Sequence, residues 1–409
     1  MIEHLFTDDC PPDDFRDGSM APYISHLELK LLEQGFSKPQ IRRLLLTASG
    51  LGRYLDTQGI ALVDAGSNNL EAYSRACGRT RSGKRTDYNT GLSTIQRLMQ
   101  VHGLLNKPEP SNSADWWLGQ FEDNQRSVRG LKLATCAGYR CYLRRFIVGL
   151  FQNDQPDWKQ LTGPYISKFL ITELKTVRAA RKTLVAGVRN FLRFLVFKGV
   201  IARGLLRAIP KSKTWRYSNL PHPLTMEDHE LVLKACQSEA AGSPRDRAFI
   251  ALLALLGLRS GEVRHLRLDD IDWREGLLHI RPGKCLHERL LPLPKEAGEL
   301  LTDYIRHARP SSPYREVFLT VLAPREPLGC AAATYLVRQF LERAGLRGPR
   351  LGTHCFRHTA ATLMVRRGAT IKQVADVLGH KSISTTQIYV KLDEESLQAV
   401  GLPWPGGEL

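Results

Sequence analysis

The amino-acid sequence predicts a mainly α-helical protein with one small antiparallel β-sheet toward its C-terminus. Two observations support this fold class. Apolar residues recur at helical spacing through most of the chain, and strand-like patterns are nearly confined to the segments LLHI (277–280) and ERLLPLP (288–294). The hydrophobic content of 43% indicates a globular protein that can bury a core. The length of 409 residues exceeds that of a typical domain. We therefore expect two or three domains.

The first half of the chain is predicted to consist of amphipathic helices, expected at residues 38–49, 131–151 and 164–174. Ser37 and Gln40 form a capping pair at the start of the first of these. A weak internal repeat, offset by 92 to 99 residues, relates the helix near 42–55 to that near 135–151. We interpret this repeat as two small helical domains in tandem.

The second half of the chain is predicted to mix helices with the two strands. Thr225 and Asp228 form a capping box at the start of one helix, and Ser243 precedes another that ends at Gly257. The strands flank the turn RPGKCLH (281–287). Further helices are expected at residues 295–309, 331–344, 354–367 and 370–378.

The net charge of +17 is concentrated in one part of the chain. Residues 174–226 contain twelve Lys or Arg and no Asp or Glu. Val177, Leu184, Val188, Phe191 and Leu195 are predicted to form the apolar stripe of a helix there. A cationic face of this kind favours duplex nucleic acid as the partner over a merely solvated surface. The candidate DNA-binding residues are Arg178, Lys182, Arg189, Arg193, Lys211, Lys213 and Arg216.

Several classes of protein are disfavoured by the sequence. No apolar stretch reaches the roughly 20 residues of a membrane helix, and the acidic N-terminal segment lacks the features of a signal peptide. The eight cysteines include no CxxC pair, so we expect reduced thiols in place of disulfides or a zinc site. We expect the protein to remain in the cytoplasm.

Candidate catalytic residues lie in the second half. Arg259 follows an apolar helix, with Glu262 three residues later as a partner for the guanidinium; a purely structural helix-end salt bridge is the alternative. The segment HCFRH places His354 and Arg357 on one helical face. His354 and His358 have the spacing of a zinc pair, but the sequence offers no third ligand.

Three further polar residues stand in segments that packing alone does not explain. His380 follows a glycine in LGHKS, and Tyr389 lies nine residues later in TTQIYV. Lys284 lies in the turn between the two strands. Each has an ordinary alternative: a packed histidine, a half-buried tyrosine and a solvated lysine.

Together these residues carry a resemblance. The series Arg259, Lys284, His354, Arg357, His380 and Tyr389, within GLRSGE, HCFRHTAAT, LGHKS and TTQIYV, resembles the tyrosine recombinase (phage integrase) family over roughly residues 225–400. The resemblance implies a site-specific recombinase of mobile-element type that cuts and rejoins DNA, as an integrase or transposase does. It implies a covalent 3′-phosphotyrosine intermediate, a Holliday junction, and no metal, ATP or other cofactor.

The resemblance also implies residue roles. Tyr389 would be the nucleophile, Arg259 and Arg357 would clamp the phosphate, and Lys284 would protonate the leaving oxygen. His354 and His380 would assist proton transfer or bind the phosphate, and Glu262 would position Arg259.

The resemblance implies four regions and an assembly. Residues 1–110 form a helical extension, either a second core-binding-like domain or an arm-binding domain. Residues 111–210 form a helical, SAM-like core-binding domain, 211–224 a basic linker, and 225–409 the catalytic domain with a C-terminal tail. The chain would close as a C-shaped clamp on double-stranded DNA and act as a homo-tetramer, or with related recombinases, near the nucleoid. A type IB topoisomerase, a non-catalytic DNA-binding regulator and a metal-dependent nuclease remain as alternatives.

Overall fold

The computed structural model describes residues 15, 18–65, 67–76, 87–104, 113–152, 155–177, 181–209, 223–282, 288–348, 351–380, 386 and 388. Contacts divide the chain into two compact units. One contains Met1–Glu28 and Arg42–Thr214, and the other contains Leu29–Ile41 and Trp215–Leu409. The expected fold class is confirmed, because helices predominate and the one three-stranded antiparallel sheet lies in the second unit.

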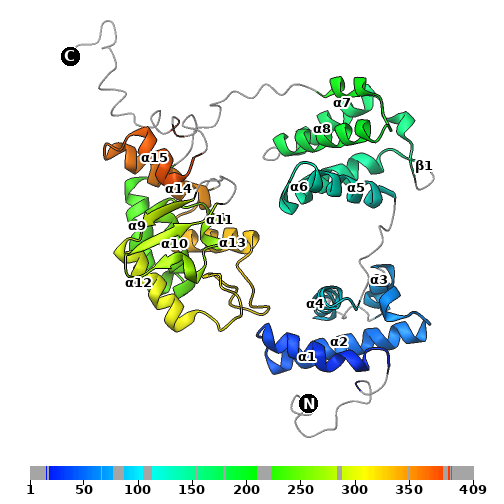
Figure 1. Ribbon diagram of the computed structural model, residues 1–409, viewed down its shortest axis with the longest axis horizontal. Helices are drawn as coiled ribbons and strands as arrows, with labels where there is room; N and C mark the ends of the chain where they lie inside the picture. The colour runs from blue at the N-terminus through cyan, green and yellow to red at the C-terminus, as the bar shows by residue number, and fades with distance from the viewer. Residues whose placement is uncertain are drawn as a thin grey trace. The chain divides into compact units, whose positions relative to one another are not determined.

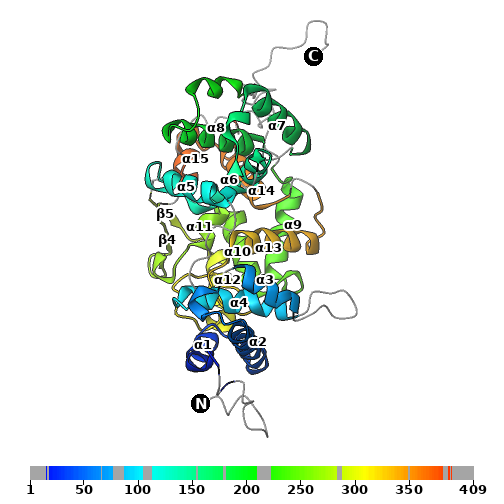
Figure 2. The same cartoon turned by 90° about the vertical axis from the view of Figure 1, so that its right-hand side faces the viewer.

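The N-terminal part contains two groups of helices, α1–α4 and α5–α8, which Figure 1 shows as separate groups. The first group consists of α1 (Ala21–Glu33), α2 (Lys38–Thr57), the 3₁₀ helix η3 (Leu62–Asp64), α3 (Ser67–Ala76) and α4 (Asp87–Val101). Helices α1 and α2 run side by side (Figure 2). Ser37 N–H donates to Gln40 Oε1 at 2.9 Å, which confirms the predicted capping pair, and α2 continues eight residues past the predicted end at Ser49.

The second group has the order α5 (Ser113–Ser127), α6 (Leu133–Val148), the short strands β1 (Phe151–Gln152) and β2 (Gln155–Pro156), η4 (Trp158–Gln160), α7 (Gly163–Thr176), α8 (Arg181–Phe197) and η5 (Arg203–Ala208). Its core is rich in aromatic side chains: Phe121, Phe146, Phe191 and Phe194 are almost completely buried and contact one another. Aromatic rings supply much buried area per residue, which suits so small a unit.

The larger unit begins with α9 (Met226–Gln237), η6 (Glu239–Ala241), α10 (Pro244–Leu256) and α11 (Ser260–Arg264). Thr225 Oγ1 accepts from Asp228 N–H at 3.1 Å, and Ser243 Oγ accepts from Asp246 N–H at 3.3 Å, so both predicted N-caps are confirmed. Helix α10 is apolar on all sides because it is the central helix: it packs against α9, α12 and α14.

The sheet and the last helices complete this unit. After η7 (Leu268–Asp270), the strands β3 (Ile271–Asp272), β4 (Leu277–Ile280) and β5 (Arg289–Pro292) pair in that order. The sequence did not predict β3. Leu278 pairs with Leu291 on the face toward the core. The remaining elements are α12 (Lys295–Asp303), the π-helical turn η8 (Tyr304–Ala308), α13 (Cys330–Arg343), α14 (Thr353–Arg366) and α15 (Ile371–Leu378).

Among the described residues, no helix has the length and hydropathy that a membrane span requires.

Candidate active site

A glycine brings three helices of the larger unit together. Gly257 caps the C-terminus of α10 with φ of 62°, the left-handed conformation that glycine adopts without strain. A Cβ at this position would lie 2.8 Å from Ala360 Cβ in α14 and 3.0 Å from Leu378 Cδ2 in α15. Because glycine has no side chain, the end of α10 can approach both helices closely. Arg259, two residues later, thereby reaches the end of α15.

Two arginines meet at this end of α15. Arg259 donates from Nη1 to Leu378 O at 3.4 Å and from Nη2 to Gly379 O at 3.1 Å. Arg357, in α14, donates to the same Leu378 O and, at 3.0 Å, to Gly257 O. The last carbonyls of a helix lack helical partners and carry a partial negative charge, which favours cations there. Two guanidinium groups from helices far apart in sequence are thus fixed around one carbonyl oxygen.

Arg289, in β5, is a third arginine at the same place, and no motif in the sequence indicated it. Its Nε donates to Val377 O at 2.8 Å, and its Nη1 and Nη2 donate to the carboxylate of Glu262 at 3.2 and 2.9 Å. Glu262 also accepts from the side chain of Arg259 at 2.9 Å and from its backbone N–H at 2.8 Å. The carboxylate therefore holds both arginines in position.

The charge of Glu262 is maintained by these contacts. Burial alone would raise the pKa of its carboxyl, but the hydrogen bonds and charge of Arg289, followed by those of Arg259, outweigh burial and hold the pKa below its usual value. The cluster contains three guanidinium groups and one carboxylate, which contacts two of them, so it keeps an excess of positive charge. Such an excess in a partly buried place favours an anionic ligand.

His380 follows the helix end directly. Gly379 ends α15 in the left-handed conformation with φ of 62°, and a Cβ there would lie 2.6 Å from Arg289 Nη1. Burial, and then the charges of Arg357, Arg259 and Arg289, lower the pKa of His380 to about 4. The imidazole is therefore neutral near pH 7. Its Nδ1 lies 2.7 Å from Thr386 Oγ1, and this contact orients the ring.

His354 lies in the first turn of α14. Its pKa is lowered by burial and then by the charges of Arg357 and Arg259, which places the imidazole near the same cations. The rings of His354 and His358 are 6.3 Å apart. Among the residues that the structure describes, no group of three His, Cys, Asp or Glu side chains could hold a metal ion.

Five candidates from the sequence lie together in the structure: Arg259, Glu262, His354, Arg357 and His380. Lys284 and Tyr389 lie outside the described residues.

Some of the predicted DNA-binding residues lie on α8, and the others lie outside the described residues. Lys182 and Arg193 are exposed and Arg189 is half-buried on α8, whose opposite face is buried in the core. The prediction that Val177 belongs to the apolar stripe of this helix is wrong: Val177 caps the C-terminus of α7, and α8 begins at Arg181. The residues outside the description are Arg178, Lys211, Lys213 and Arg216.

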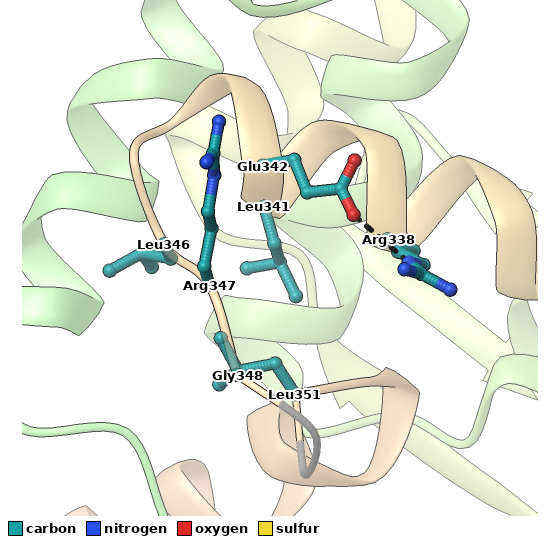
Figure 3. A pocket seen from close by; sticks show the side chains of 7 residues that line it. All are labelled: Arg338, Leu341, Glu342, Leu346, Arg347, Gly348 and Leu351. Carbon is teal, nitrogen blue, oxygen red and sulfur yellow. Dashed lines mark hydrogen bonds and ion pairs between the residues drawn. The ribbon is translucent and has the colours of Figure 1, made fainter.

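A hollow of about 360 Å³ near the end of α13 is separate from this site (Figure 3). Arg338 and Glu342 form an ion pair beside it, with 2.9 Å between Nε and Oε1. None of the five clustered residues lines it. Its lining consists of Arg338, Leu341, Glu342, Leu346, Arg347, Gly348 and Leu351.

The chain is similar to a known protein family and to individual proteins. Residues 223–396 match the Phage integrase family. Two putative integrase/recombinases of Sinorhizobium fredii (strain NBRC 101917 / NGR234) are similar over almost their full length. The protein y4rA is 31% identical, and the match covers 95% of this chain and 96% of y4rA. The protein y4rF is 38% identical, and the match covers 100% of this chain and 96% of y4rF.

Solved structures share the fold. The XerH site-specific recombinase bound to palindromic difH substrate has 20% sequence identity and a TM-score of 0.54, covering 81% of this chain and 92% of its own. A lambda integrase dimer bound to a COC′ core site has 20% sequence identity and a TM-score of 0.53, and the match covers 81% of this chain and 94% of the integrase chain.

Proposed function

We propose a mechanism from the premise that this chain belongs to the phage integrase family of tyrosine recombinases, enzymes that cut and rejoin DNA. In this mechanism Tyr389 is the nucleophile and Arg259 and Arg357 bind the phosphate of a duplex DNA strand. The observation that supports these roles is that both guanidinium groups donate to Leu378 O, while the Glu262 carboxylate also holds Arg259.

The arrangement of cations suits phosphoryl transfer. A phosphate under attack carries negative charge on its non-bridging oxygens, and donors fixed before the reaction stabilise this charge without reorganisation. Guanidinium groups stay charged at any relevant pH and bind phosphate bidentately. Arg259 and Arg357 are already oriented by backbone carbonyls, so little entropy is lost when the phosphate binds.

The proposed step conserves one phosphodiester bond. The Tyr389 oxygen forms a bond to phosphorus as the bond to the 5′ oxygen breaks, and Lys284 gives that oxygen a proton. His354 takes the phenol proton, since its lowered pKa leaves it neutral and able to accept. His380, also neutral, donates a hydrogen bond to the phosphate. Attack by another 5′-hydroxyl reverses the step on a new partner strand.

Strand exchange between two duplexes uses four such sites. We therefore propose a homo-tetramer on paired DNA. We also propose a mobile-element role and a cytoplasmic, nucleoid-associated location. The C-shaped clamp concerns parts whose relative placement is not described, and the C-terminal tail lies outside the described residues.

Covalent trapping tests the mechanism. Wild-type chain is incubated with a pool of duplexes in a chelator, denatured, and assayed for protein linked to DNA 3′ ends. We expect linkage through Tyr389 that Tyr389→Phe abolishes while gel-shift affinity is retained. Linkage that persists in Tyr389→Phe, or cleavage that needs a divalent metal, would reject the proposal. Joining of two sites, in place of relaxation of a supercoiled plasmid, separates a recombinase from a topoisomerase.

A further inference from the structure

The two four-helix groups of the N-terminal part share one order of helices, although β1 and β2 precede η4 and η5 follows α8 in the second group only. In each, two helices are followed by a 3₁₀ helix and two more helices: α1, α2, η3, α3, α4 and α5, α6, η4, α7, α8. In Figure 1 they are the blue-to-cyan and the cyan-to-green groups. The order alone is common among helical bundles, so the buried positions decide whether the two groups are copies of one fold.

The buried positions of the two groups coincide at nearly constant offsets. In the first helices the offset is 94, which relates Met20, Ile24 and Leu27 to Ala114, Leu118 and Phe121. In the second helices the offset is 95, which relates Leu44, Ala48, Leu51 and Leu55 to Tyr139, Leu143, Phe146 and Leu150. In the fourth helices the offset is 93, which relates Leu92, Ile95, Leu98 and Met99 to Val185, Val188, Phe191 and Leu192.

Close packing repeats as well. A glycine of the fourth helix approaches an equivalent residue of the second helix in each group, although the two glycines are 96 residues apart and so differ by about one helical turn from the offset of 93. A Cβ on Gly91 would lie 3.3 Å from Thr47 Oγ1 and 3.4 Å from Leu44 Cδ2, and a Cβ on Gly187 would lie 3.0 Å from Tyr139 Cδ1. A tyrosine of the third helix also donates to a carbonyl of the second, Tyr73 to Thr47 O at 3.4 Å and Tyr165 to Phe146 O at 2.8 Å, and the two acceptors differ by one helical turn from the offset of 95.

Both copies carry exposed cations on the second helix, but they differ at the equivalent positions. The fourth helix of the second copy has Lys182, Arg189 and Arg193, and the equivalent positions of α4 are Asn89, Gln96 and Gln100. The second helix shows the reverse: α2 has exposed Arg42, Arg43 and Arg53, and the equivalent positions of α6 are Ala137, Gly138 and Val148. The cations of α6 lie at other positions, where Arg140 and Arg144 pair with Asp115 and Arg145 pairs with Glu173. The cations of α2 therefore form a surface that α6 does not have at the equivalent positions.

The net positive charge of both copies supports a polyanion as the ligand of each. Residues 20–101 contain 11 Lys or Arg and 6 Asp or Glu, and residues 114–195 contain 14 and 6. Arg42 and Arg53 are eleven residues apart, about three helical turns, so they lie on one face of α2. Leu46, 36% exposed, lies between them. The cations on both sides of this leucine favour a polyanion over an apolar protein partner.

We infer that residues 20–101 are a second duplex-DNA-binding unit, a copy of the fold of residues 114–195 whose phosphate-contacting surface is on α2. This unit extends the DNA contacted by each chain beyond that bound by α8 and the catalytic unit. The inference does not depend on the catalytic roles proposed above.

Salt-dependent gel shifts of the full chain with a 40-bp duplex of arbitrary sequence test the inference. Each lost phosphate contact lowers the slope of log K against log salt by about 1. We expect Arg42→Gln/Arg53→Gln to lower the slope by about 2 and the affinity at low salt by at least about tenfold. Arg75→Gln/Arg97→Gln removes the same number of positive charges, from α3 and α4, and should leave the slope and the affinity unchanged. Arg42→Lys/Arg53→Lys, which keeps the charge, should restore them.

Two results would overturn the inference. One is wild-type affinity and slope in Arg42→Gln/Arg53→Gln. The other is unchanged DNA binding together with a loss of self-association in sedimentation, which would make α2 a protein-docking surface. Covalent trapping of Arg42→Gln/Arg53→Gln at saturating DNA should still yield the tyrosine adduct, so a failure of this inference is distinct from a failure of the proposed mechanism.

Discussion

The larger unit and the helical unit of α5–α8 place their positive charges in opposite ways. In the larger unit Arg357 is 4% exposed and the side chain of Arg289 is 10% exposed, and each is fixed by named acceptors. On α8, Lys182 and Arg193 lie open to solvent on a face without acidic residues. Desolvated, fixed charges interact strongly with a bound anion, whereas exposed charges are screened by salt. The first arrangement suits chemistry on one phosphate, and the second suits binding to many.

The largest effect is expected at the most buried arginine of the site. Arg357→Gln removes a donor aimed at the phosphate and leaves Gly257 O and Leu378 O with fewer partners. We expect the single-turnover rate of covalent adduct formation to fall about 10³-fold. Arg247, also buried, pairs with Asp303 away from the site, so Arg247→Gln should reduce stability and keep the rate. Equal losses of rate in the two variants would remove the distinction between the site and the core around it.

The next effect concerns the backbone that brings the arginines together. Gly257→Ala forces a strained φ and places a methyl group 2.8 Å from Ala360 Cβ, so we expect the free energy of unfolding to fall by about 2 to 4 kcal/mol. Gly276 has φ of 63° with nothing within 4 Å of an added Cβ. Gly276→Ala should therefore cost only about 1 kcal/mol. Denaturant unfolding of both variants measures the difference, and equal costs would show that the close approach of α10, α14 and α15 is not tight.

A smaller effect is expected from Arg289, which acts through Glu262. Arg289→Gln should slow adduct formation about 10- to 100-fold while DNA affinity stays within about twofold, because Arg259 loses its fixed orientation. Arg315→Gln removes an exposed pair with Asp269 and is the control. A loss of affinity equal to the loss of rate would assign Arg289 to DNA binding in place of positioning.

The same variant has a pH signature. The depressed pKa of Glu262 contributes stability above the pKa of its unfolded state, about 4.3, and this contribution is lost as the pH falls through the folded pKa. Because Arg289→Gln raises the folded pKa, the stability gap between wild type and variant should be largest near pH 7 and should close below about pH 4. A gap that is constant with pH would indicate a purely steric effect.

The smallest effect is expected at the exposed face of α8. Arg193→Gln should weaken DNA binding about three- to tenfold and lower the salt slope by about 1, with adduct formation unchanged at saturating DNA. Arg338→Gln, at an exposed arginine of α13, is the control. A large loss of rate in Arg193→Gln would show that α8 belongs to the reaction site.

The local features of the fold were predictable because their signals lie within a few residues. The caps at Ser37, Thr225 and Ser243 and the ends of most helices agree with the structure. The exceptions depend on packing: β3 is two residues long and exists only by pairing with β4. The wrong placement of Val177 arose because two successive helices share a continuous apolar pattern.

The sequence by itself determined the helical class, the charge, and the identity of the residues that resemble a recombinase site. The tertiary structure decided that Arg259, Arg289 and Arg357 share the last carbonyls of α15, that Glu262 serves two of them, and that His380 is neutral. These facts depend on α10, α14, α15 and β5 meeting at two glycines. Hydrogen bonds and desolvation act over a few ångströms in space, and residues up to 120 positions apart in the chain supply them here.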